Sequence, residues 1–540
     1  MPLYRLGRRL SGTYSGQMPS STPAWWRTAV IYQVYPRSFA ESATAPGHTP
    51  GVGTLAGLTG QLPYLQWLGV DALWLSPIFR SPMADFGYDV SDYCDIDPTF
   101  GTLADFDTLL EQAHAHGLRV LLDWVPNHTS DQHPWFQESR QNRTNPKADW
   151  YVWRDEPANN WHASFPAGER AWAYDDVRGQ HYLRCFLKEQ PDLNWDVPEV
   201  EAAMLDTLRF WLDRGVDGFR MDVVHLIGKD LTKDDPPEAE ARATTHIIYN
   251  DQPATHERLR AIRSVLDGYP GDRTSVGEVY LLDEAAMADY YGDGDELHLA
   301  FNFRFLWARF LPADLRERIR TTTTLLADRG GWPTWVLSNH DVPRHRQRYG
   351  GDELDARMAA IMLLTLPGTP FMYQGEELGL VDAEIPADRV VDPGLRDGCR
   401  APIPWDATPL HGWTADPWLP FPPEAGTRNV ATETADEGSM LHFYRRLLAL
   451  RRATPALHAA GPGDDFRLIA GTPDLLAWER TAEGEQWFTY VNPTSAEQAD
   501  HGFMHGATIV LATDPALDGT TVGPALPARV AFVARRSGTM

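Results

Sequence analysis

Short apolar runs alternate with longer amphipathic stretches along most of the chain. Apolar runs bounded by turn residues are typical of buried strands, whereas apolar positions spaced three and four apart are typical of helices. Amphipathic stretches such as 103–117 and 199–215 each end in Gly, a helix-stop signal. The eight strand-like segments are 29–35, 72–78, 119–125, 218–224, 274–280, 297–303, 334–340 and 369–375. Eight such alternations predict an α/β fold, a (β/α)8 TIM barrel with its helices outside.

Two parts of the chain depart from this alternation. Residues 129–195 are rich in Trp, Asn, Asp and Pro and have no clear helical period, and structureless connections of that length are rare. We therefore predict an inserted subdomain there, after the third strand. After a helical segment at 440–453, short strand patterns without helices between them predict a C-terminal antiparallel β domain at 456–540. The barrel would then comprise 23–128 and 196–455.

Composition and net charge limit the kinds of molecule that the protein is expected to bind. An apolar share of 43% permits a large core, and a formal net charge of −26 argues against nucleic acid and anionic membranes, since phosphate binding depends on clustered Lys and Arg. The substrate is therefore expected to be a neutral or cationic small molecule. The 20 Trp, 19 Tyr and 21 Phe residues offer flat faces that suit sugar rings, but they also fill a large core, so composition leaves both interpretations open.

The N-terminal tail and the cysteines bear on location. Residues 1–22 contain basic residues but neither the apolar region of a signal peptide nor a membrane-spanning run, which predicts a disordered tail and no membrane partner. Cys94, Cys185 and Cys399 are widely scattered, so they form neither a disulfide framework nor a metal-ligand spacing. A reducing cytoplasm is the simplest location. The sequence says nothing about the oligomeric state.

In such a barrel the reactive groups lie where strands end. Three carboxylates, Asp222, Glu278 and Asp341, would share this rim, with Arg220 two residues before Asp222. Any one of them could cap a helix or pair with an arginine, but crowding three is costly unless the charges have a use. Glycoside hydrolysis uses such a group, with an ionised carboxylate and a protonated one. The polar residues at these strand ends are Asp123, Asn127, His128, Arg220, Asp222, Glu278, His340 and Asp341.

Four segments carry a family resemblance. "DWVPNH", "GFRMDVVH", "GEVY" and "VLSNHD" lie in this order on the third, fourth, fifth and seventh strands, and they resemble the four signature segments of the α-amylase family of glycoside hydrolases. "PDLNW", "WWRTAVIYQVYPRSF" and "DFGYDVSDY" resemble the oligo-1,6-glucosidase and α-glucosidase branch of that family. The resemblance extends from about residue 23 to the C-terminus.

The resemblance implies a role for each catalytic residue. Asp222 would be the nucleophile that forms a covalent glucosyl-enzyme, and Glu278 would be the general acid and then the base that activates water. Asp341 would stabilise the transition state by holding sugar hydroxyls. Arg220 would orient Asp222 and keep it ionised, while Asp123 is expected to be structural, as is Asn127.

It also implies the residues that bind the glucose ring. His128 and His340 would bind hydroxyls, and Tyr88 would be a stacking platform, although without the motifs all three could be ordinary core residues. "LRDGCRAPIPW" resembles a further branch segment, and the match makes Arg400 the second arginine of the pocket. Asp85 and Arg400 would grip the non-reducing end, which indicates exo-acting cleavage.

Two stretches differ from the family or leave specificity open. Many branch members bind calcium through an aspartate-rich loop after the first strand, but residues 41–55 contain one carboxylate, Glu41, so we predict no metal there, and we expect no cofactor. Val223 should line the entrance where the leaving sugar lies. In this branch Val accompanies α-1,6 linkages and Thr or Ala accompanies α-1,4, but His225 adds an unusual polar group, so the linkage stays open.

The leading hypothesis is a retaining exo-α-glucosidase that releases α-D-glucose from short α-glucosides such as maltose, isomaltose or sucrose, with transglucosylation as a further reaction. The alternative is a glucosyltransferase or isomerase of the same family, of the trehalose synthase or isomaltulose synthase type. The absence of an "RLDRD"-like stretch disfavours an isomaltulose-forming enzyme. A non-catalytic transporter subunit with this fold is disfavoured by the intact carboxylates.

Overall fold

The computed structural model describes most of the chain. The predicted tail, residues 1–22, lies outside the described part. The described residues are 23–42, 47, 49–166, 168–237, 251–458 and 465–536.

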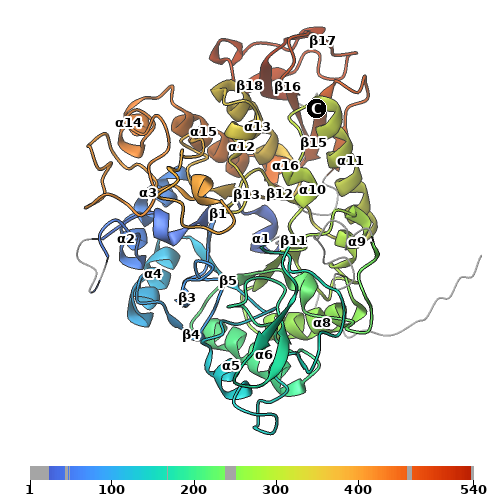
Figure 1. The fold of residues 1–540 in the computed structure, drawn as a ribbon. Coiled ribbons are helices and arrows are strands. Elements are labelled where there is room, and N and C mark those ends of the chain that lie inside the picture. Colours follow the sequence, from blue (N-terminus) through green and yellow to red (C-terminus); the bar gives the residue numbers. More distant parts are fainter. Residues whose placement is uncertain are drawn as a thin grey trace, which may run out of the picture.

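Eight parallel strands form the central sheet. They are β1 (Ile31–Val34), β2 (Ala72–Leu75), β5 (Arg119–Trp124), β9 (Gly218–Met221), β10 (Thr274–Gly277), β11 (Leu299–Ala300), β12 (Thr334–Val336) and β13 (Thr369–Tyr373). Their order is β11-β10-β9-β5-β2-β1-β13-β12, and the hydroxyl of Thr334 in β12 donates to the carbonyl of Ala300 in β11. The sheet therefore nearly closes on itself, which confirms the predicted (β/α)8 barrel (Figure 1).

Helices surround the barrel and pack on it through apolar side chains such as those of Phe106, Leu109 and Leu208. The cap of α4 shows how the sequence starts a helix: the Thr102 side chain accepts from the Asp105 amide, and the Asp105 carboxylate accepts from the Thr102 amide. The longer helices are α4 (Leu103–Ala115), α6 (Pro198–Asp213), α8 (Pro253–Asp267), α11 (Pro312–Asp328), α13 (Glu353–Thr365) and α15 (Met440–Ala453). The shorter ones are α1 (Trp25–Thr28), α2 (Leu55–Gly60), α3 (Leu62–Leu68), α9 (Glu284–Asp289), α10 (Phe303–Leu306), α12 (His345–Arg348), α14 (Val430–Ala435) and α16 (Pro455–His458).

The predicted insertion after the third strand carries its own small sheet. Between β5 and α6 lie α5 (Pro134–Ser139), β6 (Trp153–Arg154), β7 (Trp172–Asp175) and β8 (Gln180–Leu183), with the strands ordered β6-β8-β7. We call residues 129–195 subdomain B. Its sheet packs on α5 through Phe136, whose ring stacks on Trp153 at 5.4 Å. A second excursion, after β2, is the pair β3 (Phe79–Arg80) and β4 (Asp92–Ile96).

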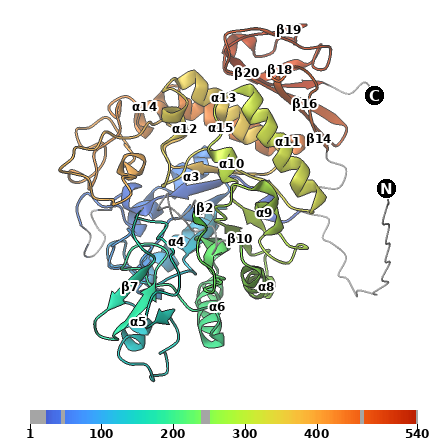
Figure 2. The same ribbon diagram turned by 45° about the vertical axis from the view of Figure 1, so that its right-hand side comes forward.

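The C-terminal region is antiparallel, as predicted. Its main sheet has the order β14-β15-β16-β20-β18, and β17 pairs with β19. Helix α13 packs against β16 and β20, so the sheet rests on the barrel's helical layer, away from subdomain B (Figure 2). The strands are β14 (Asp465–Leu468), β15 (Leu476–Ala482), β16 (Glu485–Asn492), β17 (Gln498–Ala499), β18 (Thr508–Ala512), β19 (Ala525–Leu526) and β20 (Val530–Arg536).

None of the helices in the described part of the chain is both long enough and apolar enough to cross a bilayer.

Candidate active site

One buried guanidinium lies at the centre of the carboxyl-end rim of the barrel. Arg220 of β9 donates through Nη1 to Asp222 Oδ1 at 2.8 Å and to Asp123 Oδ1 at 2.7 Å, and through Nη2 to Glu278. The register of the strands explains why these side chains meet. Asp123 in β5 pairs with Arg220 in β9, and Glu278 directly follows β10. Three carboxylates from three neighbouring strands therefore share one arginine.

The charge of this cluster favours a bound proton. Burial raises the pKa of Asp222 well above its usual range and outweighs the opposing effect of Arg220, and burial raises the pKa of Asp123 to about 6. Arg220 lowers the pKa of Asp222, as expected, but offsets only part of the effect of burial, because one guanidinium serves three buried carboxylates. The neighbouring charges of Glu278 and Asp123 add to the rise in the pKa of Asp222.

The segment after Asp222 holds Glu278 in place. Strand β9 ends at Met221, and Val223 has a left-handed backbone (φ 35°) that turns its N–H toward Glu278 Oε2 at 3.2 Å. His225 Nδ1 lies 3.0 Å from the Glu278 carbonyl oxygen. The Val223 side chain packs in an apolar cluster with Trp161 and other residues of subdomain B. This turn therefore couples the two carboxyl groups to the subdomain.

Asp341 lies in a cationic environment. The Asn339 carboxamide accepts from the Asp341 N–H at 2.8 Å and fixes the turn after β12. Asp341 Oδ1 accepts from Arg396 Nη1 at 2.9 Å and from Arg400 Nη2 at 3.2 Å. Burial raises the pKa of Asp341, but His340 and the two arginines outweigh it and hold that pKa well below its usual range. Asp341 is therefore an anion at neutral pH.

A different arginine from the predicted one contacts Asp85. Arg396 Nη2 lies 2.8 Å from Asp85 Oδ1 and 2.7 Å from Asp392 Oδ1. Arg400 lies deeper, and its Nε donates to the His340 carbonyl at 2.8 Å. Asp85 and Arg400 were expected to bind the non-reducing end of the substrate together. Arg396, rather than Arg400, contacts Asp85, and the role of Arg400 in substrate binding stays a prediction. The segment "LRDGCR" contains both arginines four residues apart, so spacing alone did not distinguish them.

Tyr88 and His340 form a stacked pair in the barrel mouth. Their ring centroids are 5.5 Å apart with an interplanar angle of 8°, and the Tyr88 hydroxyl lies 3.1 Å from Asp123 Oδ2. The guanidinium carbon of Arg220 lies 5.6 Å from the Tyr88 ring centroid. Burial lowers the pKa of His340 to about 3, so its imidazole is neutral and able to hydrogen-bond a hydroxyl.

His128 is held by a buried polar network that the sequence did not reveal. Asn127 Nδ2 lies 3.1 Å from His128 Nδ1 and donates to Asp192 Oδ1 at 3.2 Å. Lys229 Nζ donates to Asn127 Oδ1 at 2.7 Å and lies 3.2 Å from Asp192 Oδ2. Burial lowers the pKa of His128 to about 4, so this ring is also neutral. The only sequence signal was the "PDLNW" segment, which contains Asp192.

The stretch predicted to lack a metal is only partly described. Glu41 accepts hydrogen bonds from the Gly51 N–H at 3.1 Å and from the Thr414 N–H at 2.9 Å, so its carboxylate joins two loops. Within the described residues, no group of three or more His, Cys, Asp or Glu side chains is arranged to hold a metal ion. The absence of a metal in this protein stays a prediction.

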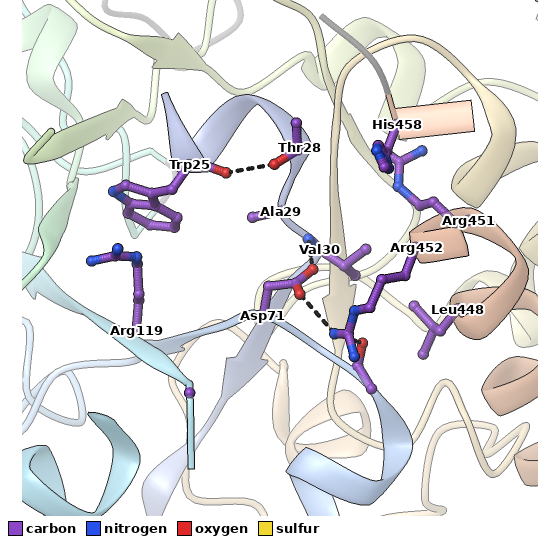
Figure 3. Close-up of a pocket in the computed structure, with 12 residues that line it drawn as sticks. Trp25, Thr28, Ala29, Val30, Asp71, Arg119, Leu448, Arg451, Arg452 and His458 are labelled. Carbon is purple, nitrogen blue, oxygen red and sulfur yellow. Dashed lines mark hydrogen bonds and ion pairs between the residues drawn. The ribbon is translucent and has the colours of Figure 1, made fainter. Parts of the chain in front are cut away.

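A cavity of about 290 Å³ lies at the opposite end of the barrel, where the strands begin (Figure 3). Its charged groups are already paired, since Arg452 Nη2 lies 2.7 Å from Asp71 Oδ1 and Arg119 Nη1 lies 2.8 Å from Asp217 Oδ1. The cavity therefore lacks the carboxylate cluster found at the other rim, and the carboxyl ends of the strands stay the candidate active site.

Two carboxyl groups on one guanidinium and a third carboxylate at the mouth of a (β/α)8 barrel are typical of glycoside hydrolases. The chain belongs to the α-amylase family, because the family model "Alpha amylase, catalytic domain" matches residues 33–460.

Known proteins resemble the chain over most of its length. A "Probable alpha-glucosidase" of Rhizobium meliloti (strain 1021) is 42% identical over 504 residues, covering 87% of this chain and 89% of that protein. An "Oligo-1,6-glucosidase" of Parageobacillus thermoglucosidasius is 36% identical over 520 residues, covering 87% and 90%. The crystal structure of an "alpha-glucosyl transfer enzyme" has a TM-score of 0.86 at 38% identity, covering 96% of this chain and all of that one.

Proposed function

We propose that the protein is a retaining, exo-acting α-glucosidase that releases α-D-glucose from the non-reducing end of short α-glucosides such as maltose, isomaltose or sucrose. The observation that carries this proposal is the contact of Asp222 and Glu278 with one another and with the single guanidinium of Arg220. Such close carboxyl groups suit a direct attack on the sugar, whereas an inverting enzyme separates them to admit water. The names of the relatives agree with the substrate class.

The closeness of the two carboxyl groups fits the first chemical step. As general acid, Glu278 gives a proton to the glycosidic oxygen while Asp222 Oδ attacks the anomeric carbon, so the leaving alcohol departs neutral and a glucosyl ester forms on Asp222. Glu278, now ionised, takes a proton from water, and the resulting hydroxide attacks the same carbon and releases Asp222. Two inversions give overall retention, so α-D-glucose is the product.

Asp341 and the neutral histidines bind the sugar in this proposal. Asp341 is ionised beside Arg396 and Arg400, so it accepts hydrogen bonds from sugar hydroxyls as positive charge develops on the ring. His128 and His340 are neutral and hydrogen-bond other hydroxyls. Interactions that strengthen as the ring distorts lower the barrier to the reaction.

The exo mode rests on Arg396. Its guanidinium lies between Asp85, Asp341 and Asp392, within 2.9 Å of a carboxylate oxygen of each. This network ties the loop after β2 to the loop after β13 and blocks the far side of the glucose-binding position. Asp85 and Arg396 then bind the hydroxyls of a terminal glucose, which supports cleavage from the non-reducing end.

Val223 is the proposed determinant of linkage preference. It follows the nucleophile and packs against subdomain B, so a change there alters the site of the leaving sugar. The Val223→Thr variant is expected to shift the ratio of isomaltose to maltose hydrolysis toward maltose, because the hydroxyl adds a hydrogen-bonding group to an apolar contact. Rates on both disaccharides measure it, and an unchanged ratio removes Val223 from the specificity argument.

Transfer of glucose to a sugar acceptor is the second candidate. The observation that favours it is the similarity to a structure named as an α-glucosyl transfer enzyme. Transfer and hydrolysis share the covalent intermediate and differ only in whether a hydroxyl or water intercepts it. Product analysis at rising disaccharide concentration distinguishes them, because a hydrolase yields two monosaccharides per cleavage, whereas a transferase or isomerase yields new oligosaccharides or an isomeric disaccharide.

We infer a cytoplasmic enzyme without nucleic-acid partners. None of the three cysteines, Cys94, Cys185 and Cys399, is in a disulfide, which suits a reducing compartment. The net charge of −26 disfavours phosphate backbones.

The test is an Asp222→Asn variant assayed on maltose, isomaltose, sucrose, trehalose and maltotriose. We expect kcat to fall by at least about a thousandfold on every substrate that the wild type cleaves, since the nucleophile is removed. Asp206→Asn is the matched control, because that side chain is exposed on α6 and pairs only with Arg209. Hydrolysis that survives in Asp222→Asn, or release of β-glucose by the wild type, contradicts the proposal.

A further inference from the structure

Gln33 is a buried amide side chain in the wall of the barrel. It lies in β1, opposite Trp74 of β2, and is only 1% exposed. Both N–H groups of its carboxamide are directed at a partner, since Nε2 donates to Ser76 Oγ at 3.0 Å and lies 2.8 Å from His340 Nδ1. Within the described residues its Oε1 has no hydrogen-bond partner. A buried amide is costly unless it is hydrogen-bonded, so its two donated bonds are the reason for a glutamine at this depth.

The His340 ring is held so that its two nitrogens face different partners. It stacks on Tyr88 and also on Tyr35, with the Tyr35 ring centroid 6.0 Å away at an interplanar angle of 27°. Nδ1 faces Gln33, whereas Nε2 lies 2.5 Å from the Tyr88 hydroxyl and 3.2 Å from Asp341 Oδ2. Because the ring is fixed between two aromatic faces, the position of its proton determines which bonds it makes.

The charges around His340 keep its ring neutral. Burial is the largest effect and lowers the pKa of His340 to about 3, while Asp341 opposes burial and three arginines add to it. A neutral imidazole carries one proton, and the hydrogen-bond partners of the two nitrogens decide which nitrogen holds it. The charged and titratable groups that face His340 are Asp341, Arg220, Arg396, Arg400, Tyr35, Tyr88 and Cys399.

The Asp341 carboxylate favours the proton on Nε2. Asp341 is ionised and can only accept, so an Nε2–H faces it favourably, whereas a lone pair on Nε2 would face an anion at 3.2 Å. With the proton on Nε2, Nδ1 becomes the acceptor and needs a donor. The Gln33 amide is that donor, and Ser76 occupies its other N–H.

The same proton sets the direction of the hydrogen bonds that lead to the nucleophile. When Nε2–H donates to the Tyr88 oxygen, the Tyr88 hydroxyl donates its own proton to Asp123 Oδ2 at 3.1 Å. Asp123 Oδ1 accepts from Arg220 Nη1, which also donates to Asp222. A proton on Nδ1 instead would draw the Tyr88 proton to Nε2 and remove one donor from Asp123. Bonds in such a network depend on one another.

This tautomer also suits a sugar hydroxyl held between His340 and Asp341. A hydroxyl has one proton, which the ionised Asp341 accepts, so the hydroxyl oxygen then needs a donor. Nε2–H is such a donor, whereas an Nε2 without a proton would compete with Asp341 for the same hydroxyl proton. The bond to Asp341 strengthens as positive charge develops on the ring, so the loss of its partner affects the transition state most.

We propose that Gln33 is a positioning residue, whose amide N–H holds His340 in the Nε2–H tautomer so that the ring donates to the substrate beside Asp341. Gln33 acts through His340 and does not touch the sugar. The effect on rate rests on the proposed α-glucosidase function, whereas the tautomer is a property of the free enzyme.

The tautomer is measured by NMR on the free enzyme. In protein labelled with 15N-histidine, long-range 1H–15N correlations at pH 7 report the protonation of each ring nitrogen, and the His340 signals are those that His340→Gln lacks. We expect a proton on Nε2 in the wild type and a proton on Nδ1 in Gln33→Glu, because a carboxylate accepts where the amide donated. A wild-type ring protonated on Nδ1 overturns the inference, and so does a tautomer that is unchanged in both Gln33→Glu and Gln33→Met.

Rates test the consequence for the reaction. Gln33→Met keeps the length of the side chain and removes both N–H groups, so kcat on the best disaccharide substrate is expected to fall about tenfold, roughly the effect of one lost hydrogen bond, with KM changed less. Gln374→Met is the matched control. Gln374 is fully buried directly after β13, and its Oε1 accepts from the Tyr35 N–H at 2.7 Å, away from the His340 nitrogens.

Equal losses of kcat in Gln33→Met and Gln374→Met would identify a packing role and overturn the inference. A wild type that cleaves no α-glucoside is a separate outcome. It overturns the proposed function, while the NMR measurement still decides whether Gln33 sets the tautomer.

Discussion

Replacing Lys229 by Met should release subdomain B from the barrel. The Lys229 side chain is only 5% exposed, and its ammonium donates at 2.7 Å to Asn127 Oδ1 and to the Leu226 carbonyl and lies 3.2 Å from the fully buried Asp192 carboxylate. Methionine has a similar length and fills the same space, so the change removes the charge and not the packing. Asp192 is then a buried anion without a counterion.

The structure sets the size of the effect. Removing one partner of a buried ion pair costs about 3–5 kcal/mol. Asp192 keeps hydrogen bonds from the Cys185 N–H at 2.9 Å, from Cys185 Sγ at 2.8 Å and from Asn127 Nδ2 at 3.2 Å. We therefore expect a cost at the low end of this range, about 3 kcal/mol. This cost corresponds to roughly a hundredfold rise in the population of molecules in which subdomain B is open.

Native-state hydrogen exchange measures that population. Amides of β7 and β8 are expected to exchange about a hundredfold faster in Lys229→Met, while those of β1 and β2 keep their rates, because the opening is local. KM is expected to rise as well, since Asn127 lies against His128. Adding Asp192→Asn removes the stranded charge and is expected to restore much of the protection. Unchanged exchange rates in Lys229→Met refute the role of Lys229 in holding subdomain B. So do effects of the two substitutions on exchange that simply add in the double variant.

Two further predictions concern other charges of the molecule. Arg396→Ala is expected to lower kcat/KM at least about a hundredfold, because Asp85 and Asp341 lose the cation that they share. Arg389→Ala, in the same loop, is the control and is expected to change kcat/KM little. Equal losses in the two variants contradict the proposed role of Arg396. Burial lowers the pKa of His298 to about 3, against roughly 6.5 unfolded, so the unfolded chain binds the extra proton and stability falls as pH drops below about 6.5. In the His298→Gln variant, the free energy of unfolding should fall less steeply as the pH decreases, by up to about 1.4 kcal/mol per pH unit. Denaturant titrations at pH 4–6 measure this free energy, and an equal dependence on pH in the variant and the wild type contradicts the prediction.

The local pattern of apolar and polar residues predicted the architecture, because each helix or strand shows its own characteristic spacing of apolar residues. The helix expected at 440–453 is α15 with those bounds, and the five strand patterns of the C-terminal region form a five-stranded sheet. Barrel strands were placed correctly but drawn too long. The segment 297–303 shortens to the two residues of β11, since the chain there turns into α10 once Asn302 caps that helix. An apolar run predicts that its residues are buried, but it does not predict where the hydrogen bonding between neighbouring strands ends.

The meeting of the three candidate carboxylates could also be predicted from the sequence, because strand ends in a (β/α)8 barrel lie at one rim. Asp222, Glu278 and Asp341 lie on that rim with their expected neighbours. Their ionisation was not readable. It depends on how many charges share each arginine, and a single guanidinium serves three carboxylates at Arg220 while two arginines hold Asp341.

Other features arose only from the tertiary structure. Arg396 and Arg400 are equivalent by spacing, and only packing decided which of them reaches Asp85. Lys229 joins Asn127 and Asp192, which lie far apart in the chain. The sequence by itself determined the barrel, the inserted subdomain, the C-terminal sheet and the rim on which the three carboxylates lie, because local periodicity and strand ends encode them. The partner of each charge depends on long-range packing, which no local pattern records.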